Sequence, residues 1–453
     1  MGEQLRKLAQ FVATVRWEDV PAAPRQRTKL VLLDTLGIML AGSLRPEVRG
    51  LSERLAATRG TGATVFGPGW QSADPRTAGL LNSMSGRSLE MSEGLRGLQA
   101  AVHVVPAIVA ISESLHSSGK QLLQALVLGY EFAGRLSRGY TPRALSHPNG
   151  QISLLASVAA AARLYELDGA GVDLSVRIAT AMLMTPSYNN TAAGGTNLNL
   201  AAGMGSFAAG LAPEMALAGY VAPENAIEEA LDKLVGAAFT PDAVADNLGT
   251  AWEISDNYFR FYACCNPIHP CLDSLQDVLA TLRPQPEEIA RIDAETFAFA
   301  TVMSNQDPPN YFASKYSFPH AAATLAVRHD IGFSDMDDSA LIDPIISALR
   351  HRVFMTEDPK MTALGPTLKP ARVTVTLTDG RQATASCENS RRDTFRPDPE
   401  AQVREKFREL AATILSSDGV AHVEAAVDRC EDWKSVEELT VLLRRYGRSV
   451  TPC

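Results

Sequence analysis

The feature that most constrains the fold is a series of Ala- and Leu-rich segments with helical periodicity that fills most of the first 260 residues. Short Gly, Pro or polar breaks separate these segments, as expected where one helix ends and the next begins. The clearest of them span residues 28–43, 121–136, 152–167 and, more briefly, 176–184. The first half of the chain is therefore predicted to be a block of packed helices.

The sequence changes character at residues 257–272, which read NYFRFYACCNPIHPCL and are dense in aromatic residues, Cys and Pro. Such a change indicates a domain junction. Beyond it, residues 292–302 have strand character. Val and Leu alternate with Thr over residues 373–378, before the turn residues Asp379-Gly380. This alternation followed by an Asp-Gly turn predicts a β-hairpin.

Helical periodicity returns near the C-terminus. After a Pro-rich break at residues 396–400, apolar residues from 403 to 415 follow the spacing of an amphipathic helix, which is expected to pack on the first block. We therefore predict a mainly α protein with a large all-helical domain and a smaller α+β lid domain. The predicted boundaries are 1–263 for the helical domain, 264–395 for the lid and 396–453 for the returning C-terminal helices.

Composition and charge exclude several classes of function. With 46% hydrophobic and 21% charged residues, the 453-residue chain is typical of a globular protein. Its formal net charge of −9 argues against nucleic acid and anionic membranes as partners, although a local basic pocket is compatible with it. The apolar stretch 198–221 is long enough to span a membrane, but its Gly and Pro residues favour a helix buried in the bundle.

The chain start and the cysteines favour a cytoplasmic protein with reduced thiols. The first 15 residues lack the apolar core of a signal peptide, and Cys453 is not in the position that prenylation requires. Three of the six cysteines gather with His269 in one short segment, CCNPIHPC, at residues 264–271. This set lacks the paired spacing of a zinc site, so no metal is expected, and nothing indicates a nucleophilic thiol.

Several stretches along nearly the whole chain resemble, in order, the MmgE/PrpD family. They are KLVLLDTLGIMLAGS (29–43), LLNSMSGRSLEMSEG (80–94), the helical run 104–136, SHPNG (146–150), YFRFYACCNPIHP (258–270), KYSFPHAAATLA (315–326) and VREKF (403–407). The family includes 2-methylcitrate dehydratase, cis-aconitate decarboxylase and iminodisuccinate epimerase. The resemblance implies homodimers without cofactors, with a helical domain and a smaller α+β lid.

The resemblance also implies candidate catalytic residues. His147 matches the histidine of the family's His-Pro dipeptide, and His320 stands where the lid motif has a tyrosine. Imidazoles titrate near neutral pH, so these two residues are the predicted acid/base pair. Glu90 lies in a stretch that is usually more acidic in the family. We expect it to orient a histidine, or to act as a base if burial or the neighbouring Glu93 raises its pKa.

The candidate substrate-binding residues are Arg260, Lys315, Gln99 and Asn199. Arg260 keeps the charge of a family lysine, and its planar guanidinium suits a carboxylate. Lys315 is a second cation, in the lid motif. Gln99 replaces a usual histidine, and Asn199 adjoins Leu198, where the family usually carries a cation. For all these candidates the structural alternatives are capping or packed histidines, a stacked arginine and solvent-exposed acids.

Three functions remain open on the sequence alone. The resemblance favours a lyase that dehydrates or decarboxylates a small carboxylic acid by histidine acid/base chemistry. An isomerase or epimerase with two bases facing one carbon is the alternative. The third possibility is a protein that has kept the fold and binds a ligand without turnover, because several usual family positions are altered.

Overall fold

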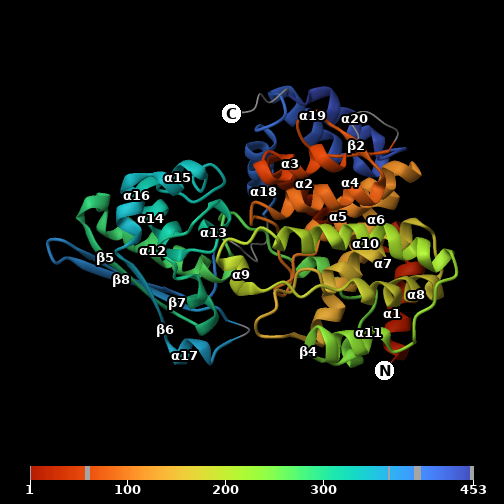
Figure 1. Cartoon of the computed structure of the whole chain (residues 1–453), viewed down its shortest axis with the longest axis horizontal. Coiled ribbons are helices and arrows are strands. Elements are labelled where there is room, and N and C mark those ends of the chain that lie inside the picture. Colours follow the sequence, from red (N-terminus) through yellow and green to blue (C-terminus); the bar gives the residue numbers. More distant parts are fainter. Residues whose placement is uncertain (1, 57–61, 366–367, 392–398, 449–453) are drawn as a thin grey trace.

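The computed structural model describes residues 2–56, 62–365, 368–391 and 399–448. Figure 1 shows two lobes. One is built of helices from the first half of the chain together with the C-terminal helices, and the other combines a sheet with shorter helices. The prediction of a mainly α protein with a smaller α+β part is confirmed.

The first lobe, called the helical lobe below, contains long helices and two short two-stranded ribbons. Its helices are α1 (Gly2–Thr14), α2 (Ala22–Gly42), α3 (Pro46–Leu55), α4 (Pro75–Arg87), α5 (Ala101–Leu115), α6 (Gly119–Arg138), α7 (Ile152–Leu164), α8 (Gly169–Ala179), α9 (Tyr188–Ala192), α10 (Leu198–Leu217) and α11 (Ala226–Glu229). The ribbons pair β1 (Ala63–Thr64) with β2 (Ser72–Ala73) and β3 (Tyr140–Pro142) with β4 (Gly236–Phe239).

Local sequence explains where these helices begin and how closely they pack. Ser118 and Gln121 form a capping box at the start of α6, which satisfies backbone donors that the first turn leaves open. In α10, a Cβ atom on Gly203 would lie 2.8 Å from Cγ of Met84, and one on Gly205 would lie 2.6 Å from the His103 ring. Glycine is therefore required for this close helix contact.

Helix α10 is the one described helix that is long and apolar enough to cross a membrane by length and composition. Within the fold it packs against α4, α5, α7 and α8, and 56% of its most apolar window is buried. Its apolar residues thus serve the interior of the helical lobe.

The C-terminal segment completes the helical lobe, as Figure 1 shows for its dark-blue helices beside α2 and α3. It comprises α18 (Glu400–Ala411), α19 (Ser417–Asp428) and α20 (Glu437–Tyr446). Helix α18 packs along α2, and Val403, Phe407 and Leu443 are fully buried in the same hydrophobic cluster as Leu36 and Leu126. The chain therefore leaves the helical lobe near residue 260 and returns to it.

The second lobe, called the lid lobe below, is built on a four-stranded sheet in the order β6-β5-β7-β8. Its strands are β5 (Ile289–Thr296), β6 (Val353–Glu357), β7 (Ala371–Leu377) and β8 (Gln382–Cys387), and its helices are α12 (His269–Leu282), α13 (Tyr311–Ser314), α14 (Phe318–Arg328), α15 (Asp338–Ile342), α16 (Pro344–Arg350) and α17 (Pro359–Thr362). Strands β5 and β6 are parallel and the other pairs antiparallel.

The predicted hairpin is present, with Val373 opposite Ala385 and Val375 opposite Ala383. Residues of β7 alternate between buried and partly exposed, because α12 covers one face of the sheet. The predicted strand at 292–302 is wrong in its second half: β5 ends at Thr296 and a 3-10 helix occupies Ala298–Met303. This segment instead turns Phe297 and Phe299 toward the helical lobe, where both line a cleft.

Three hydrophobic clusters are found among the described residues, and two of them are large. The first holds the interior of the helical lobe and includes Phe259 and Phe261. The second contains the core of the lid lobe and also includes residues of the helical lobe, among them Ile38, Leu89 and Leu410. The predicted break between residues 395 and 396 lies outside the described residues, as does Cys453.

Candidate active site

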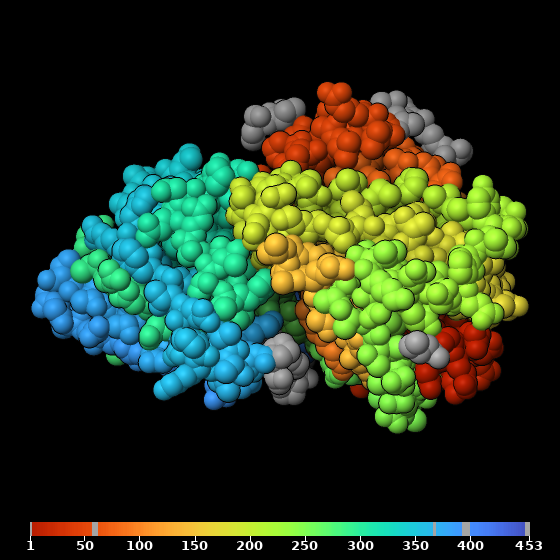
Figure 2. All heavy atoms as spheres, turned by 60° about the horizontal axis from the view of Figure 1, so that its bottom comes forward, coloured from red at the N-terminus to blue at the C-terminus, as the bar shows by residue number. Residues whose placement is uncertain are grey.

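A cleft between the two lobes collects polar residues from segments far apart in the sequence. Its volume is about 430 Å³, within the range of roughly 300–1,000 Å³ usual for small-molecule sites. The residues that line it include Glu90, Gln99, Tyr140, Arg143, His147, Tyr188, Tyr258, Arg260, Cys265, Phe297, Phe299 and Lys369. Figure 2 shows the lobes in contact, with the lid lobe in green to blue and the part of the helical lobe that the first half of the chain forms in red to lime.

Glu90 is the centre of a buried ion-pair network at the cleft. Its Oε1 accepts a hydrogen bond of 2.8 Å from Arg260 Nη1, and its Oε2 contacts Arg87 Nη1. The hydroxyl of Tyr316 donates to the same Oε2 at 2.8 Å and accepts from Arg87 Nη2 at 2.7 Å. The α4 terminus, the domain junction and the lid lobe are thereby held together by one carboxylate.

The electrostatics of this network fix its charge. Burial disfavours the charged form of Glu90, but the guanidinium groups of Arg87 and Arg260 outweigh that cost and lower its pKa to about 2. Burial likewise opposes the charge of both arginines, while Glu90 raises the pKa of each. All three groups are ionised at neutral pH, which leaves one net positive charge.

Glu90 therefore does not meet the condition under which it was predicted to act as a base, because its pKa is lowered. The raised pKa belongs to Glu93, where burial brings it to about 7, and Glu93 does not line the cleft. Glu90 also has a positive φ of 57°, which is uncommon for a residue with a side chain and typical of functional sites. Its geometry suits a residue that positions the two arginines.

His147 lines the cleft and is held in one tautomer. Its Nδ1 accepts a hydrogen bond of 3.2 Å from the backbone N–H of Asn149, so the proton of the neutral ring lies on Nε2. The ring stacks on Tyr188 with a centroid separation of 5.1 Å and an interplanar angle of 12°. Burial, helped by Arg87, lowers the pKa of His147 to about 3. The imidazole is therefore neutral at pH 7 and offers an N–H donor.

Gln99 belongs to a second polar group beside His147. Its Oε1 accepts from Asn149 Nδ2 at 2.9 Å, while its buried Nε2 has no hydrogen-bond partner. His103, which donates from Nδ1 to the Gln99 carbonyl at 2.9 Å, supports the same turn. Because a buried donor without a partner is costly, Gln99 Nε2 is a ready donor for a bound oxygen atom.

The remaining three predicted site residues do not line this cleft. His320 is fully buried in α14, neither ring nitrogen has a partner, and burial lowers its pKa to about 3. Lys315 Nζ donates to the Met336 carbonyl and lies 4.1 Å from the Tyr311 ring centroid, and burial lowers its pKa to about 7. Asn199 is buried in the first turn of α10. The structure thus brings together Glu90, Gln99, His147 and Arg260.

The cysteine-rich junction contributes one thiol to the cleft. Cys265 Sγ lies 3.0 Å from the Tyr188 hydroxyl, and burial raises the pKa of the thiol to about 12. His269 bonds through Nε2 to the Cys264 carbonyl at 2.9 Å. In the described part of the chain, no group of three or more His, Cys, Asp or Glu side chains could hold a metal ion.

Sequence reasoning did not single out Tyr188, Tyr316 or Phe299 as site residues. Tyr188 stacks on His147 and Tyr316 bonds both Glu90 and Arg87. The only local signal was the lid motif at 315–326, in which Tyr316 follows Lys315. Tyr188 and Phe299 lie outside every stretch that carried the family resemblance.

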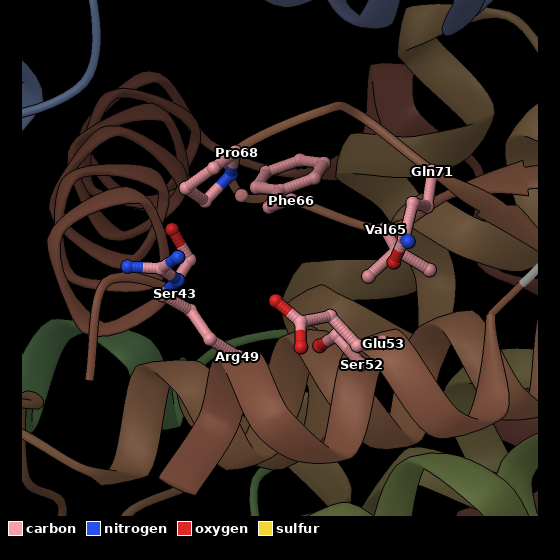
Figure 3. Close-up of a pocket in the computed structure, with 9 residues that line it drawn as sticks. Ser43, Arg49, Ser52, Glu53, Val65, Phe66, Pro68 and Gln71 are labelled. Carbon is pink, nitrogen blue, oxygen red and sulfur yellow. The ribbon is translucent and has the colours of Figure 1, made fainter. Parts of the chain in front are cut away.

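A second, smaller hollow lies between α3 and the β1–β2 ribbon (Figure 3). Its volume is about 40 Å³, and Arg49, Ser52 and Glu53 face Val65 and Phe66 across it. It holds none of the predicted site residues. The larger cleft is therefore the candidate active site.

Comparison with known proteins matches both halves of the chain to one family. Residues 6–242 match the MmgE/PrpD N-terminal domain, and residues 262–432 match the MmgE/PrpD C-terminal domain. The cis-aconitate decarboxylase of Aspergillus terreus is 22% identical over 96% of this chain and 95% of its own length. The human cis-aconitate decarboxylase is 24% identical, with 92% and 90% covered. A cis-aconitate decarboxylase-like protein, oryM, of Aspergillus oryzae is 23% identical, with 98% and 97% covered.

Proposed function

Because the chain belongs to the MmgE/PrpD family, we propose that it is a cofactor-independent lyase that removes CO₂ or water from a small carboxylic acid. The observation that carries the proposal is the convergence of His147, Arg260, Glu90 and Gln99 on one cleft. Relatives named as cis-aconitate decarboxylases along nearly the full chain support a carboxylate substrate.

Each of these residues has a role that its surroundings favour. Arg260, fixed by Glu90, would bind the substrate carboxylate that stays in the product. Loss of CO₂ leaves an electron pair on carbon, conjugated with that carboxylate, so Arg260 would also stabilise the enolate. The Nε2–H of His147 would donate a hydrogen bond to the developing charge and pass its proton to the carbon that forms the new C–H bond. A proton from solvent would replace it on the ring in the same step, so that the imidazole is neutral before and after the reaction. Gln99 Nε2 would hold a further substrate oxygen.

The test incubates the full-length protein with a panel of unsaturated and hydroxylated carboxylic acids and measures products by mass spectrometry. Loss of the mass of CO₂ or of water is expected for at least one acid. His147→Gln, which keeps a donor but cannot transfer the proton, should lower kcat/KM about 100-fold or more. His320→Phe, outside the cleft, should retain most activity. Turnover that survives His147→Gln and is lost in His320→Phe would overturn the site assignment.

The isomerase alternative has less support from the geometry. It required two histidines facing one carbon, and His147 is the only histidine among the described residues that line the cleft. Deuterated buffer separates the two reactions, because an isomerase incorporates label into an acid of unchanged composition. Absence of any turnover, with binding retained, would favour the ligand-binding alternative.

The proposal also includes the homodimer and the cytoplasmic location that the family resemblance and the sequence led us to expect. Measuring the molar mass of the protein in solution tests the homodimer.

A further inference from the structure

Aromatic side chains line the cleft beside its polar residues. The side chains concerned, called the aromatic wall below, are Tyr140, Tyr188, Tyr258, Phe297 and Phe299. They come from both lobes: β3, α9, the domain junction and the segment after β5. Such a wall favours apolar or unsaturated substrate carbon rather than additional charged groups.

The aromatic wall leads directly from solvent to the predicted catalytic ring. Phe299 is 42% exposed, and its ring meets Tyr188 edge-to-face at a centroid separation of 4.7 Å. Tyr188 in turn stacks on His147 at 5.1 Å. A planar, unsaturated chain could therefore contact Phe299 and Tyr188 while its carboxyl end reaches the vicinity of His147.

The charge of the Glu90 ion-pair network allows a limited number of carboxylates. Arg87 and Arg260 together carry two positive charges and Glu90 one negative charge, and all three are buried. One net positive charge balances one carboxylate. A second carboxylate placed against this network would lack a compensating charge from it, which is strongly unfavourable.

The other cations that line the cleft differ in how far a carboxylate compensates their charge. Arg96 is paired with Glu253 and Asp256, each at 2.6 Å. Lys369 donates to the Asn266 side chain, and the exposed Arg143 donates to the Lys233 carbonyl at 2.8 Å. Arg143 and Lys369 are the two groups able to favour a second carboxylate. Binding of a polycarboxylate through these two cations is therefore the alternative that an experiment must exclude.

We propose that the substrate is an amphipathic monocarboxylic acid, with its one carboxylate at Arg260 and an unsaturated or aromatic chain against Tyr188 and Phe299. Because the carboxylate at Arg260 stays in the product, the reaction of such an acid is loss of water rather than loss of CO₂. This inference rests on the proposed function in taking the cleft as the substrate site, and it departs from the polycarboxylate named for the relatives. It assigns Phe299 as a specificity residue.

The experiment measures binding by calorimetry on the full-length protein at physiological ionic strength, with trans-cinnamate, acrylate and cis-aconitate as probes. Cinnamate is expected to bind at least tenfold more tightly than either of the others. Phe299→Ala should weaken cinnamate binding about three- to tenfold and leave acrylate binding unchanged. The matched control is Phe354→Ala, a 38% exposed phenylalanine on β6 outside the cleft, which should leave all three affinities unchanged.

Two outcomes would overturn the inference: tighter binding of cis-aconitate than of cinnamate, or equal effects of the two phenylalanine variants. Weakening of cis-aconitate binding by Arg143→Ala would show that this cation selects polycarboxylates. Failure of the monocarboxylate inference is distinguishable from failure of the proposed lyase activity. Efficient decarboxylation of cis-aconitate would uphold the activity and reject the monocarboxylate, whereas selective cinnamate binding without turnover of any acid would do the reverse.

Discussion

At the scale of single residues, the charge of Glu90 controls both arginines of the candidate site. Glu90→Gln keeps an oxygen for Arg260 but leaves two buried guanidinium groups without a counter-charge. We expect the free energy of unfolding to fall by about 3 kcal/mol and kcat/KM to fall at least tenfold, because Arg260 is no longer held in place. Denaturant titration and steady-state kinetics measure the two effects.

The control for this variant is Glu131→Gln. Glu131 pairs with Arg135 at 2.9 Å, both residues are fully buried, and neither lines the cleft. It should also lose stability but keep kcat/KM within about twofold of the parent protein. If both variants reduced activity equally, Glu90 would have only a structural role.

The candidate site could be predicted only in part, for reasons that individual residues make clear. His147 and Arg260, which line the cleft, were predicted because each lies in a short motif of a known family. His320 was predicted on the same basis, but α14 is buried on nearly every side from Phe318 to Ala326, so the sequence carries no signal for the side that faces the cleft. Phe299 follows a strand whose end at Thr296 is set by tertiary contacts, which local patterns do not encode.

At the scale of secondary-structure elements, the returning helix α18 anchors the segment that carries Glu90. Lys406 Nζ lies 2.8 Å from Asp34 Oδ1 on α2 and donates to the Met91 carbonyl at 2.7 Å. Both charged groups are buried. Lys406→Met should therefore destabilise the protein by about 3–5 kcal/mol, since Asp34 is left as an uncompensated buried charge.

The double variant Lys406→Met/Asp34→Leu separates stability from positioning. Replacing a buried ion pair by apolar residues often restores stability, so unfolding should return close to that of the parent protein. The Met91 carbonyl still lacks its donor, and we expect kcat/KM to remain several-fold reduced. Full recovery of both quantities would show that α18 does not position the Glu90 segment.

The arrangement of elements was easier to predict than their contacts. The Ala- and Leu-rich periodicity indicated α2, α6 and α7, and the Val/Thr alternation indicated the β7–β8 hairpin, because each pattern is local. The pairing of Lys406 with Asp34 joins residues 372 positions apart, and no pattern in either helix specifies it.

At the scale of the whole molecule, buried neutral histidines make stability depend on acid pH. Burial lowers the pKa of His103 to about 4 and that of His147 and His320 to about 3. Unfolding returns them toward 6.5, so the unfolded state binds more protons between these values. The stability they contribute is present above pH 6.5 and lost as the pH falls. Glu93 and Glu131, with pKa values raised by burial to about 7, have the opposite effect between about pH 4.5 and 7.

His320→Phe isolates one of these contributions, because neither His320 ring nitrogen has a hydrogen-bond partner to lose. At pH 7 the variant should be as stable as the parent or slightly more so, since no imidazole nitrogen is then buried without a partner. Between pH 7 and pH 5 the free energy of unfolding should fall by about 2 kcal/mol more in the parent than in the variant.

Denaturant unfolding at each pH measures the difference. The matched control is His422→Phe, which replaces an exposed ring stacked on Tyr446. Parallel pH profiles for parent and His320→Phe would mean that the pKa of His320 is not lowered in the folded protein.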